Sequence, residues 1–360
     1  MPIRLQGSSL RKVSLKGDTN IYELGSDGLL NRYFIISDPG SRKLLSTPEV
    51  VGFDCYKALV APTAAAIRYL EEIGKGGGFD ILTILRGGLN YPLEEAAAIN
   101  GTRVRDMHFL SCERIIKDHV ITGLEIKYEK IRPTTGRTLA IGDIIASGAT
   151  MELCLDYIVK AFRDGGGSLR RILFFTIGGT RAMDIMEELT PKIREIFPGF
   201  EGFFCFFYEG MFTVYDGPGV SGINVRDIDF GWNGGVVSPE FRRHTVMAHP
   251  DSLLEKCIIY DGGARRYEIP LHLDEVADYW KGILVRASII DTKALVGEKL
   301  GYPEPLAYEA WKAHTLNPGD KDRDLWEAET HMLRRAGVMD LAALAEKRLE
   351  SIENLKQLYI

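Results

Sequence analysis

The stretch RTLAIGDIIASGATM, residues 137–151, decides how the fold of this chain is interpreted. An apolar run ends at Gly142 and a single carboxylate, Asp143, and two isoleucines later a loop of small residues opens a second apolar segment. A buried strand, a tight loop and a helix in this order can hold an anion, because small side chains let backbone N–H groups approach it and the helix N-terminus carries a partial positive charge. From the loop alone, an ordinary strand-to-helix turn capped by Asp143 is an equal alternative.

The flanking sequence predicts the fold class. FDILTIL (79–85) and RRILFFTIGG (170–179) are apolar without alternation, which is typical of strands covered on both faces. Segments with helical spacing, such as MELCLDYIVKAF (151–162), alternate with them. We therefore expect an α/β fold in which helices flank a parallel twisted sheet. Another helix is expected over 53–73, kinked or divided at Pro62.

Composition divides the chain into three parts. Residues 1–50 contain short alternating pieces, which we expect to form strands or an arm packed on the core. The main α/β domain is expected over 51–273, and a helical C-terminal region over 274–360. Within the main domain, the polar and basic-leaning insert 113–137 predicts a flexible hairpin at the sheet edge, with its turn at Gly123.

Composition and charge also limit the function classes. The 360 residues are 45% hydrophobic and 26% charged, as in ordinary globular proteins, and the net charge of -6 argues against a nucleic-acid partner. No segment reaches the run of apolar residues that a membrane span or a signal peptide needs, so we expect a cytoplasmic protein without a membrane partner. The five cysteines are spread singly, which predicts free thiols and no structural metal site.

The segment TLAIGDIIASGAT (138–150) resembles the binding signature of the type I phosphoribosyltransferases for 5-phosphoribosyl 1-pyrophosphate (PRPP). In that signature, four apolar residues, two acids and two apolar residues precede a small loop that ends in threonine. Asp143 matches the second acid, which contacts the ribose hydroxyls and indirectly helps to hold Mg²⁺ in the family, whereas Gly142 replaces the first acid. The resemblance implies that the 5′-phosphate is held by Ala146, Ser147, Gly148, Ala149 and Thr150.

A second segment, ILRGGL (84–89), resembles the pyrophosphate loop of the same family. The resemblance implies that Arg86 and the backbone of Gly87 and Gly88 face the pyrophosphate, and a peptide bond in this loop is often cis in relatives. The insert 113–137 lies where relatives carry a flexible loop that closes over the reacting atoms. Its candidates for neutralising pyrophosphate are Lys117, Lys127, Lys130 and Arg132, and a solvated hairpin face is the alternative role for each.

The resemblance implies a Mg²⁺-dependent phosphoribosyltransferase of nucleotide metabolism, with Arg86 and Asp143 as the catalytic candidates. A nucleobase would displace pyrophosphate from PRPP, and a homodimer would be typical of the family. Ala146 stands where 6-oxopurine enzymes carry an acid, and ILRGGL is close to the loop of uracil enzymes, so a pyrimidine acceptor is favoured over a purine. DGPGVSGINVRDIDFG (216–231) is loosely similar to the segment that clamps uracil. Because Gly142 replaces an acid, a regulatory protein that binds PRPP or nucleotides without catalysis is the alternative.

Overall fold

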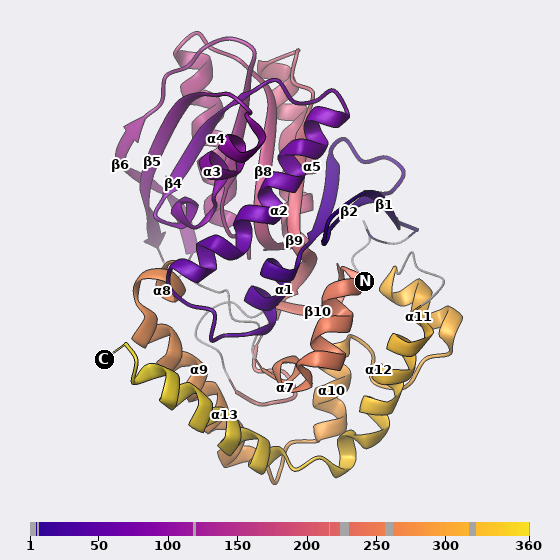
Figure 1. Ribbon diagram of the computed structural model, residues 1–360. Coiled ribbons are helices and arrows are strands. Elements are labelled where there is room, and N and C mark those ends of the chain that lie inside the picture. The colour runs from indigo at the N-terminus through magenta and orange to yellow at the C-terminus, as the bar shows by residue number, and fades with distance from the viewer. Residues whose placement is uncertain are drawn as a thin grey trace.

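A ten-stranded mixed sheet forms the centre of the computed structural model, which describes residues 5, 7–117, 120–215, 217–223, 230–255, 262–316 and 322–359 (Figure 1). The strand order is β1-β2-β3-β9-β8-β7-β4-β5-β6, and β10 pairs with β9. The strands are β1 (Ser9–Lys16), β2 (Thr19–Gly25), β3 (Arg32–Ser37), β4 (Phe79–Leu85), β5 (Val104–Lys117), β6 (Val120–Lys130), β7 (Arg137–Gly142), β8 (Leu169–Gly179), β9 (Phe203–Val214) and β10 (Phe230–Val237).

Six neighbouring strands, from β3 to β5 in the sheet, are parallel to one another. In chain order, the five strands β4, β5, β7, β8 and β9 have the spatial order 2-1-3-4-5 of a doubly wound sheet. In such sheets, ligands bind at the carboxyl ends of the strands where the order reverses, which here is between β4 and β7. The topology therefore makes this end of the sheet the candidate binding edge.

Helices cover both faces of this sheet, because alternate residues of each strand point to opposite sides. On one face, Ala140 packs in a core with α2 and α3. On the other face, Leu139 and Ile141 pack with α4 and α5. The longer helices up to β9 are α1 (Pro39–Ser46), α2 (Phe53–Glu72), α3 (Leu93–Asn100), α4 (Ala149–Asp164) and α5 (Arg181–Ile196). The expected α/β fold, with a helix-flanked parallel core, is confirmed.

The chain after β10 is helical, and Figure 1 shows these helices gathered beyond one end of the sheet, with α9 and α13 side by side. Helical structure begins at Pro239, well before residue 274. The helices are α6 (Pro239–Arg243), α7 (Pro250–Leu253), α8 (Gly262–Tyr267), α9 (Ile269–Arg286), α10 (Thr292–Leu300), α11 (Tyr308–Thr315), α12 (Arg323–Arg335) and α13 (Leu341–Lys356), with a π-helical turn at His244–Ala248 and a 3-10 turn at Ala336–Val338. In the described part of the chain, no helix is long and apolar enough to cross a membrane.

Of the two alternatives expected at Pro62, a division of the helix is excluded, because α2 is continuous through this residue. The expected position of the hairpin turn needs correction. The insert does form a hairpin of β5 and β6, but Gly123 lies within β6 opposite Ile115, and the pairing of the two strands continues to Lys117 and Val120. Cross-strand pairing extends both strands past Gly123, so the glycine occupies a strand position with room around it and not a turn.

Candidate functional site

Two loops that are far apart in sequence meet at the switch point of the sheet. One follows β4 and contains Gly87 and Gly88, and the other follows β7 and contains Asp143. A Cβ atom placed on Gly87 would lie 2.5 Å from Oδ1 of Asp143, and one on Gly88 would lie 3.2 Å from the Gly142 carbonyl oxygen. A side chain at either glycine would crowd the loop after β7, so the two segments singled out in the sequence lie against each other and form one candidate site.

The loop after β4 presents a cation at this edge. The peptide bond between Leu85 and Arg86 is cis, as the family resemblance implies for this loop, and Gly87–Asn90 forms a 3-10 turn. The Arg86 side chain is 52% exposed and forms an ion pair of 2.9 Å with Glu268, which lies between α8 and α9. The guanidinium can therefore reach an anion from solvent, but the anion must compete with this carboxylate.

The loop after β7 has the features of an anion site. Gly148 has φ +76° and precedes the first residue of α4, and no side chain among the described residues caps that helix. The first N–H groups of a helix have no partner within it, so they remain available to an anion. Ala146 is buried, Ser147 is exposed, and Ala149 and Thr150 are half-buried in the first turn. The arrangement suits a phosphate group lying on the N-terminus of α4.

Asp143 is the one acid of the site that the sequence identified. Its Oδ1 accepts a hydrogen bond of 2.8 Å from the backbone N–H of Ile144. Burial raises the pKa of its carboxyl to about 7, although the Ile144 hydrogen bond and the charge of Arg114 lower it. A carboxyl with this pKa can exchange a proton near neutral pH or accept hydrogen bonds from sugar hydroxyls once ionised.

Gly142, which departs from the family pattern, is explained by a neighbouring ring. A Cβ atom at this position would lie 2.4 Å from Cβ and 2.5 Å from Cγ of Tyr91. Tyr91 is buried, and its hydroxyl accepts a hydrogen bond of 3.1 Å from the backbone N–H of Ile177. The tyrosine therefore fills the space that the side chain of a first acid would need.

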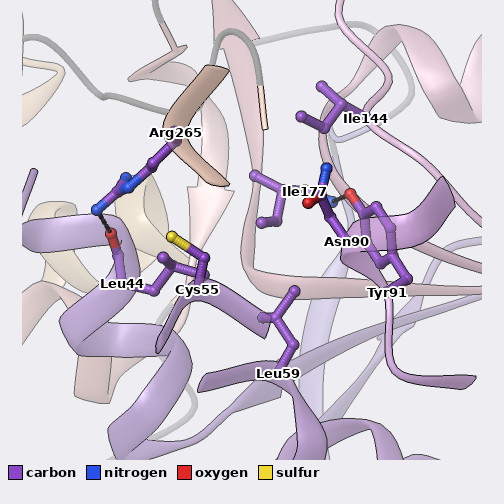
Figure 2. A pocket seen from close by; sticks show the side chains of 8 residues that line it. All are labelled: Leu44, Cys55, Leu59, Asn90, Tyr91, Ile144, Ile177 and Arg265. Atoms are coloured by element: carbon purple, nitrogen blue, oxygen red, sulfur yellow. Dashed lines mark hydrogen bonds between the residues drawn. The ribbon is translucent and has the colours of Figure 1, made fainter. Parts of the chain in front are cut away.

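A small cavity lies beside Tyr91, and Figure 2 shows Ile144, Ile177, Asn90 and Tyr91 grouped on one side of it. Its volume of ≈ 20 Å³ is enough for one water molecule. Asn90 is 7% exposed, and neither the nitrogen nor the oxygen of its amide has a hydrogen-bond partner in the described part of the chain. Since an unpaired buried amide is unfavourable, this side chain is a candidate to contact a bound molecule. The other lining residues are Leu44, Cys55, Leu59 and Arg265.

The hairpin of β5 and β6 extends past the binding edge. The last residue of β4, Leu85, pairs with Ser111, and β5 continues from there to Lys117. The hairpin thus projects beyond the strand end that carries Arg86, where a closing segment would have to lie. This position agrees with the role that the resemblance implies for the insert.

The basic candidates of the hairpin have other contacts. Lys127 pairs with Glu125 at 2.8 Å and Glu113 at 3.3 Å. The ammonium of Lys130 lies 5.8 Å from the centre of the Phe109 ring, next to the sheet. Arg132 is exposed, and its backbone N–H donates to His108. Lys117 ends β5, and its side chain lies outside the described residues. None of these contacts places the described cations on the two loops.

The segment 216–231 is described only over 217–223 and from Phe230 onward, so most of its proposed clamp lies outside the described residues. In the described piece, the Val220 N–H donates a hydrogen bond of 2.8 Å to Glu298 of α10. This contact fixes the piece to the helical region.

Sequence reasoning missed three residues of this site. Asn90 and Tyr91 directly follow the glycine loop, and an asparagine between apolar residues is the signal that could have marked Asn90. Glu268 carried no local signal, because the fold alone brings it to Arg86 from 182 residues away.

No protein-family model matches the chain, and no curated protein matches it. Among solved structures, the AQ2163 protein from Aquifex aeolicus is 16% identical, covering 49% of this chain and 87% of that one, with a TM-score of 0.33. A hypoxanthine phosphoribosyltransferase from Staphylococcus aureus is 13% identical over 36% and 67% of the two chains, with a TM-score of 0.27. A Neisseria gonorrhoeae protein with bound ppGpp is 14% identical over 34% and 66%, with a TM-score of 0.26.

Each of these three similarities covers less than half of this chain. A function for this chain therefore has to be inferred from the site itself.

Proposed function

We propose that this chain is a phosphoribosyltransferase that binds PRPP at the switch point between β4 and β7 and transfers its phosphoribosyl group to a nucleobase. The observation that carries the proposal is the contact between the two loops, in which Gly87 approaches the carboxylate of Asp143. Because one loop offers a guanidinium and the other a helix N-terminus, the site has places for two anionic groups with an acid between them. PRPP carries a phosphate and a pyrophosphate on one ribose, so its shape matches this arrangement.

In the proposed complex, the backbone of residues 146–150 and the hydroxyls of Ser147 and Thr150 hold the 5′-phosphate. Asp143 accepts hydrogen bonds from the ribose hydroxyls, which positions C1 for attack. Arg86 and the amides of Gly87 and Gly88 stabilise the pyrophosphate as it leaves. The hairpin of β5 and β6 excludes water when it closes.

The residues present are compatible with Mg²⁺ only together with the substrate. Among the described residues, no three His, Cys, Asp or Glu side chains form a metal-binding group. Mg²⁺ in phosphate sites is usually held by one or two carboxylates together with substrate phosphates, and Asp143 can supply one carboxylate. When bound, the ion would neutralise charge on the pyrophosphate.

The proposed acceptor is a pyrimidine-like base and not a purine. Ala146 is buried and provides no acid at the first loop position. The unpartnered amide of Asn90 can offer both a donor and an acceptor to the edge of a heterocycle, as asparagine does when it pairs with a base. The present cavity would have to widen for this contact, since it holds only one water molecule.

A second candidate function is a regulator that binds PRPP or a nucleotide without catalysis. The replacement of the first acid by Gly142, with Tyr91 in the vacated space, favours it, because one ligand of the ribose and metal is missing.

Titration calorimetry with PRPP and Mg²⁺ tests the binding of PRPP, which both candidate functions require. We expect saturable heat for the wild type and weaker binding for Arg86→Ala and Asp143→Asn, with Lys160→Ala on the exposed face of α4 as the matched control. No PRPP heat at millimolar ligand contradicts both candidates. A panel of purine and pyrimidine bases assayed for pyrophosphate release then separates the two, since release with one base supports the transferase and silence with intact binding supports the regulator.

A further inference from the structure

A pair of thiols lies close to the two loops and has no role in the proposed phosphate chemistry. Cys112 follows Ser111 in β5, at the point where the hairpin passes the end of β4. Cys154 lies in α4, whose N-terminus belongs to the loop 146–150. The two Sγ atoms are 3.6 Å apart, and both cysteines are free. The fold thus brings together two of the cysteines that stand singly in the sequence.

The pair has the geometry of a dithiol that can be oxidised. A disulfide bond is about 2.05 Å long, so small rotations of the two side chains bring the sulfurs from contact to bonding distance. Cys112 is half-buried, whereas Cys154 is fully buried. Cys112 is therefore the more exposed of the two thiols, and the Cys154 sulfur, 3.6 Å away, is in place to attack it next.

The two thiols also differ in acidity. The contact between the two sulfurs lowers the pKa of Cys112, and the same contact together with burial raises the pKa of Cys154. Since the thiolate is the nucleophile in disulfide exchange, Cys112 is the attacking sulfur and Cys154 the resolving one.

We propose that Cys112 and Cys154 are a site of reversible oxidation, which a low-molecular-weight disulfide such as glutathione disulfide converts into an intramolecular disulfide between β5 and α4. The Cys112 thiolate attacks one sulfur of glutathione disulfide, forming a mixed disulfide and releasing one glutathione thiolate, which takes up a proton. Cys154 loses its proton and attacks the Cys112 sulfur, releasing the second glutathione. Two protein thiols and one glutathione disulfide thus give one protein disulfide and two glutathione molecules.

The bond would join the hairpin to the helix that begins at the loop 146–150. It would therefore hold the base of the hairpin against α4 and restrict its movement over the binding edge. This inference rests on the thiol geometry and stands independently of the proposed transferase activity.

The test is incubation of the folded, full-length protein with glutathione disulfide, alkylation of the remaining thiols, and peptide mapping by mass spectrometry. We expect a single cross-linked species that joins the peptides of Cys112 and Cys154, lacks the mass of two hydrogen atoms, and returns to free thiols with dithiothreitol. A Cys112 that stays alkylatable, stays as a glutathione adduct, or pairs with another cysteine overturns the proposal.

Variants separate the two roles. Cys154→Ser is expected to stop at the glutathione adduct on Cys112, because the resolving sulfur is missing, whereas Cys112→Ser is expected to leave Cys154 unmodified. Cys55→Ser, which removes another buried thiol, serves as the control and is expected to form the disulfide as the wild type does. An adduct that accumulates equally in the wild type and in Cys154→Ser contradicts the resolving role, and the wild-type map decides the question if Cys154→Ser fails to fold.

Discussion

Gly142 occupies a position where backbone freedom is not needed, since its φ is not among the positive values of the chain. The reason for glycine is the ring of Tyr91, which is packed against the end of β7. An acid at 142 and a tyrosine at 91 would compete for the same volume. The two residues therefore form a pair, and a change at one changes what the other tolerates.

The variant Gly142→Asp tests this pairing. We expect it to lower the free energy of unfolding by about 1–3 kcal/mol, as overpacking of a closely packed core does. In the double variant with Tyr91→Ala, the new carboxylate can enter the vacated space, so the loss is expected to be smaller than the sum of the two single losses. Urea unfolding of the four proteins measures the coupling. Additive losses would show that the ring does not exclude an acid.

Asp143 is expected to give the stability a particular pH dependence. Its pKa of about 7 in the folded protein lies above the value of an unfolded aspartate. Between these two values the folded state binds more protons than the unfolded state, so stability falls as pH rises from about 4 to about 7. Asp143→Asn removes this titration. We therefore expect the stability of the variant relative to the wild type to rise by about 1–3 kcal/mol as pH increases from about 4 to about 7, and to stay constant above that range.

Urea unfolding at several pH values measures this difference. Burial also raises the pKa of Glu209 and of Glu255 to about 7, but both carboxyls are present in the wild type and in the variant, so their contributions cancel in the comparison. A stability difference that does not change with pH would show that Asp143 is ionised throughout.

Asp143 and the small loop after it could be identified from sequence because their chemistry is local. Tyr91 could not, because its effect on Gly142 exists only once β7 and the loop after β4 are adjacent.

At the scale of elements, the start of α4 depends on a glycine for two reasons. Gly148 has φ +76°, and a Cβ there would lie 2.1 Å from Cδ1 of Ile185 in α5. Gly166 follows the same helix with φ +71° and has nothing within 4 Å of a Cβ. A side chain at Gly166 would therefore meet backbone strain alone, whereas a side chain at Gly148 would meet both backbone strain and a clash with Ile185.

The variants Gly148→Ala and Gly166→Ala form a matched pair. Gly166→Ala is expected to cost about 1–2 kcal/mol of unfolding free energy, from left-handed backbone strain alone. Gly148→Ala is expected to cost about 1–3 kcal/mol more, because Ile185 must also move. Thermal unfolding measures the stabilities, and calorimetry with PRPP should show weaker binding for Gly148→Ala only. Equal losses in both variants would remove the contact with Ile185 from the explanation.

The elements that were predicted well from the sequence are those with one strong local pattern of residue types. Uniformly apolar runs identified β4 and β8 nearly to the residue, because strands covered on both faces leave few polar positions. The hairpin turn was misplaced at Gly123, because pairing between β5 and β6 continues past it. Such pairing depends on the partner strand, which a local pattern does not contain.

At the scale of the whole molecule, the helical region contacts the binding edge itself. Besides the pair between Glu268 and Arg86, the guanidinium of Arg265 donates to the backbone oxygens of Leu44 and Val50, near both ends of the α1–α2 connection. The composition shift predicted helical structure only from residue 274, so Arg265 and Glu268 lie outside the predicted region. The contacts of Arg265 connect positions more than 200 residues apart and have no local signal in the sequence.

Two neighbouring arginines of α6 test how this region is held. Arg242 is buried and pairs with Glu329 of α12 at 2.6 Å, and it donates to the Leu300 carbonyl oxygen at 2.8 Å. Glu329 is fully buried and also accepts from the indole of Trp311 at 2.9 Å. Arg243 pairs with Asp322 and Asp324 on the surface. Arg242 therefore belongs to a buried ion pair, and Arg243 belongs to exposed ion pairs.

Because Arg242→Ala leaves the Glu329 carboxylate buried without its partner, we expect a loss of about 3–5 kcal/mol in unfolding free energy. Arg243→Ala removes a solvent-screened pair and is expected to cost at most about 1 kcal/mol. Urea unfolding of the full chain measures both, and adding Glu329→Gln to Arg242→Ala should recover part of the loss by removing the unpaired charge. Similar losses at Arg242 and Arg243 would mean that the buried pair does not hold α6 to α10 and α12, and the packing of these helices would then depend on apolar contacts alone.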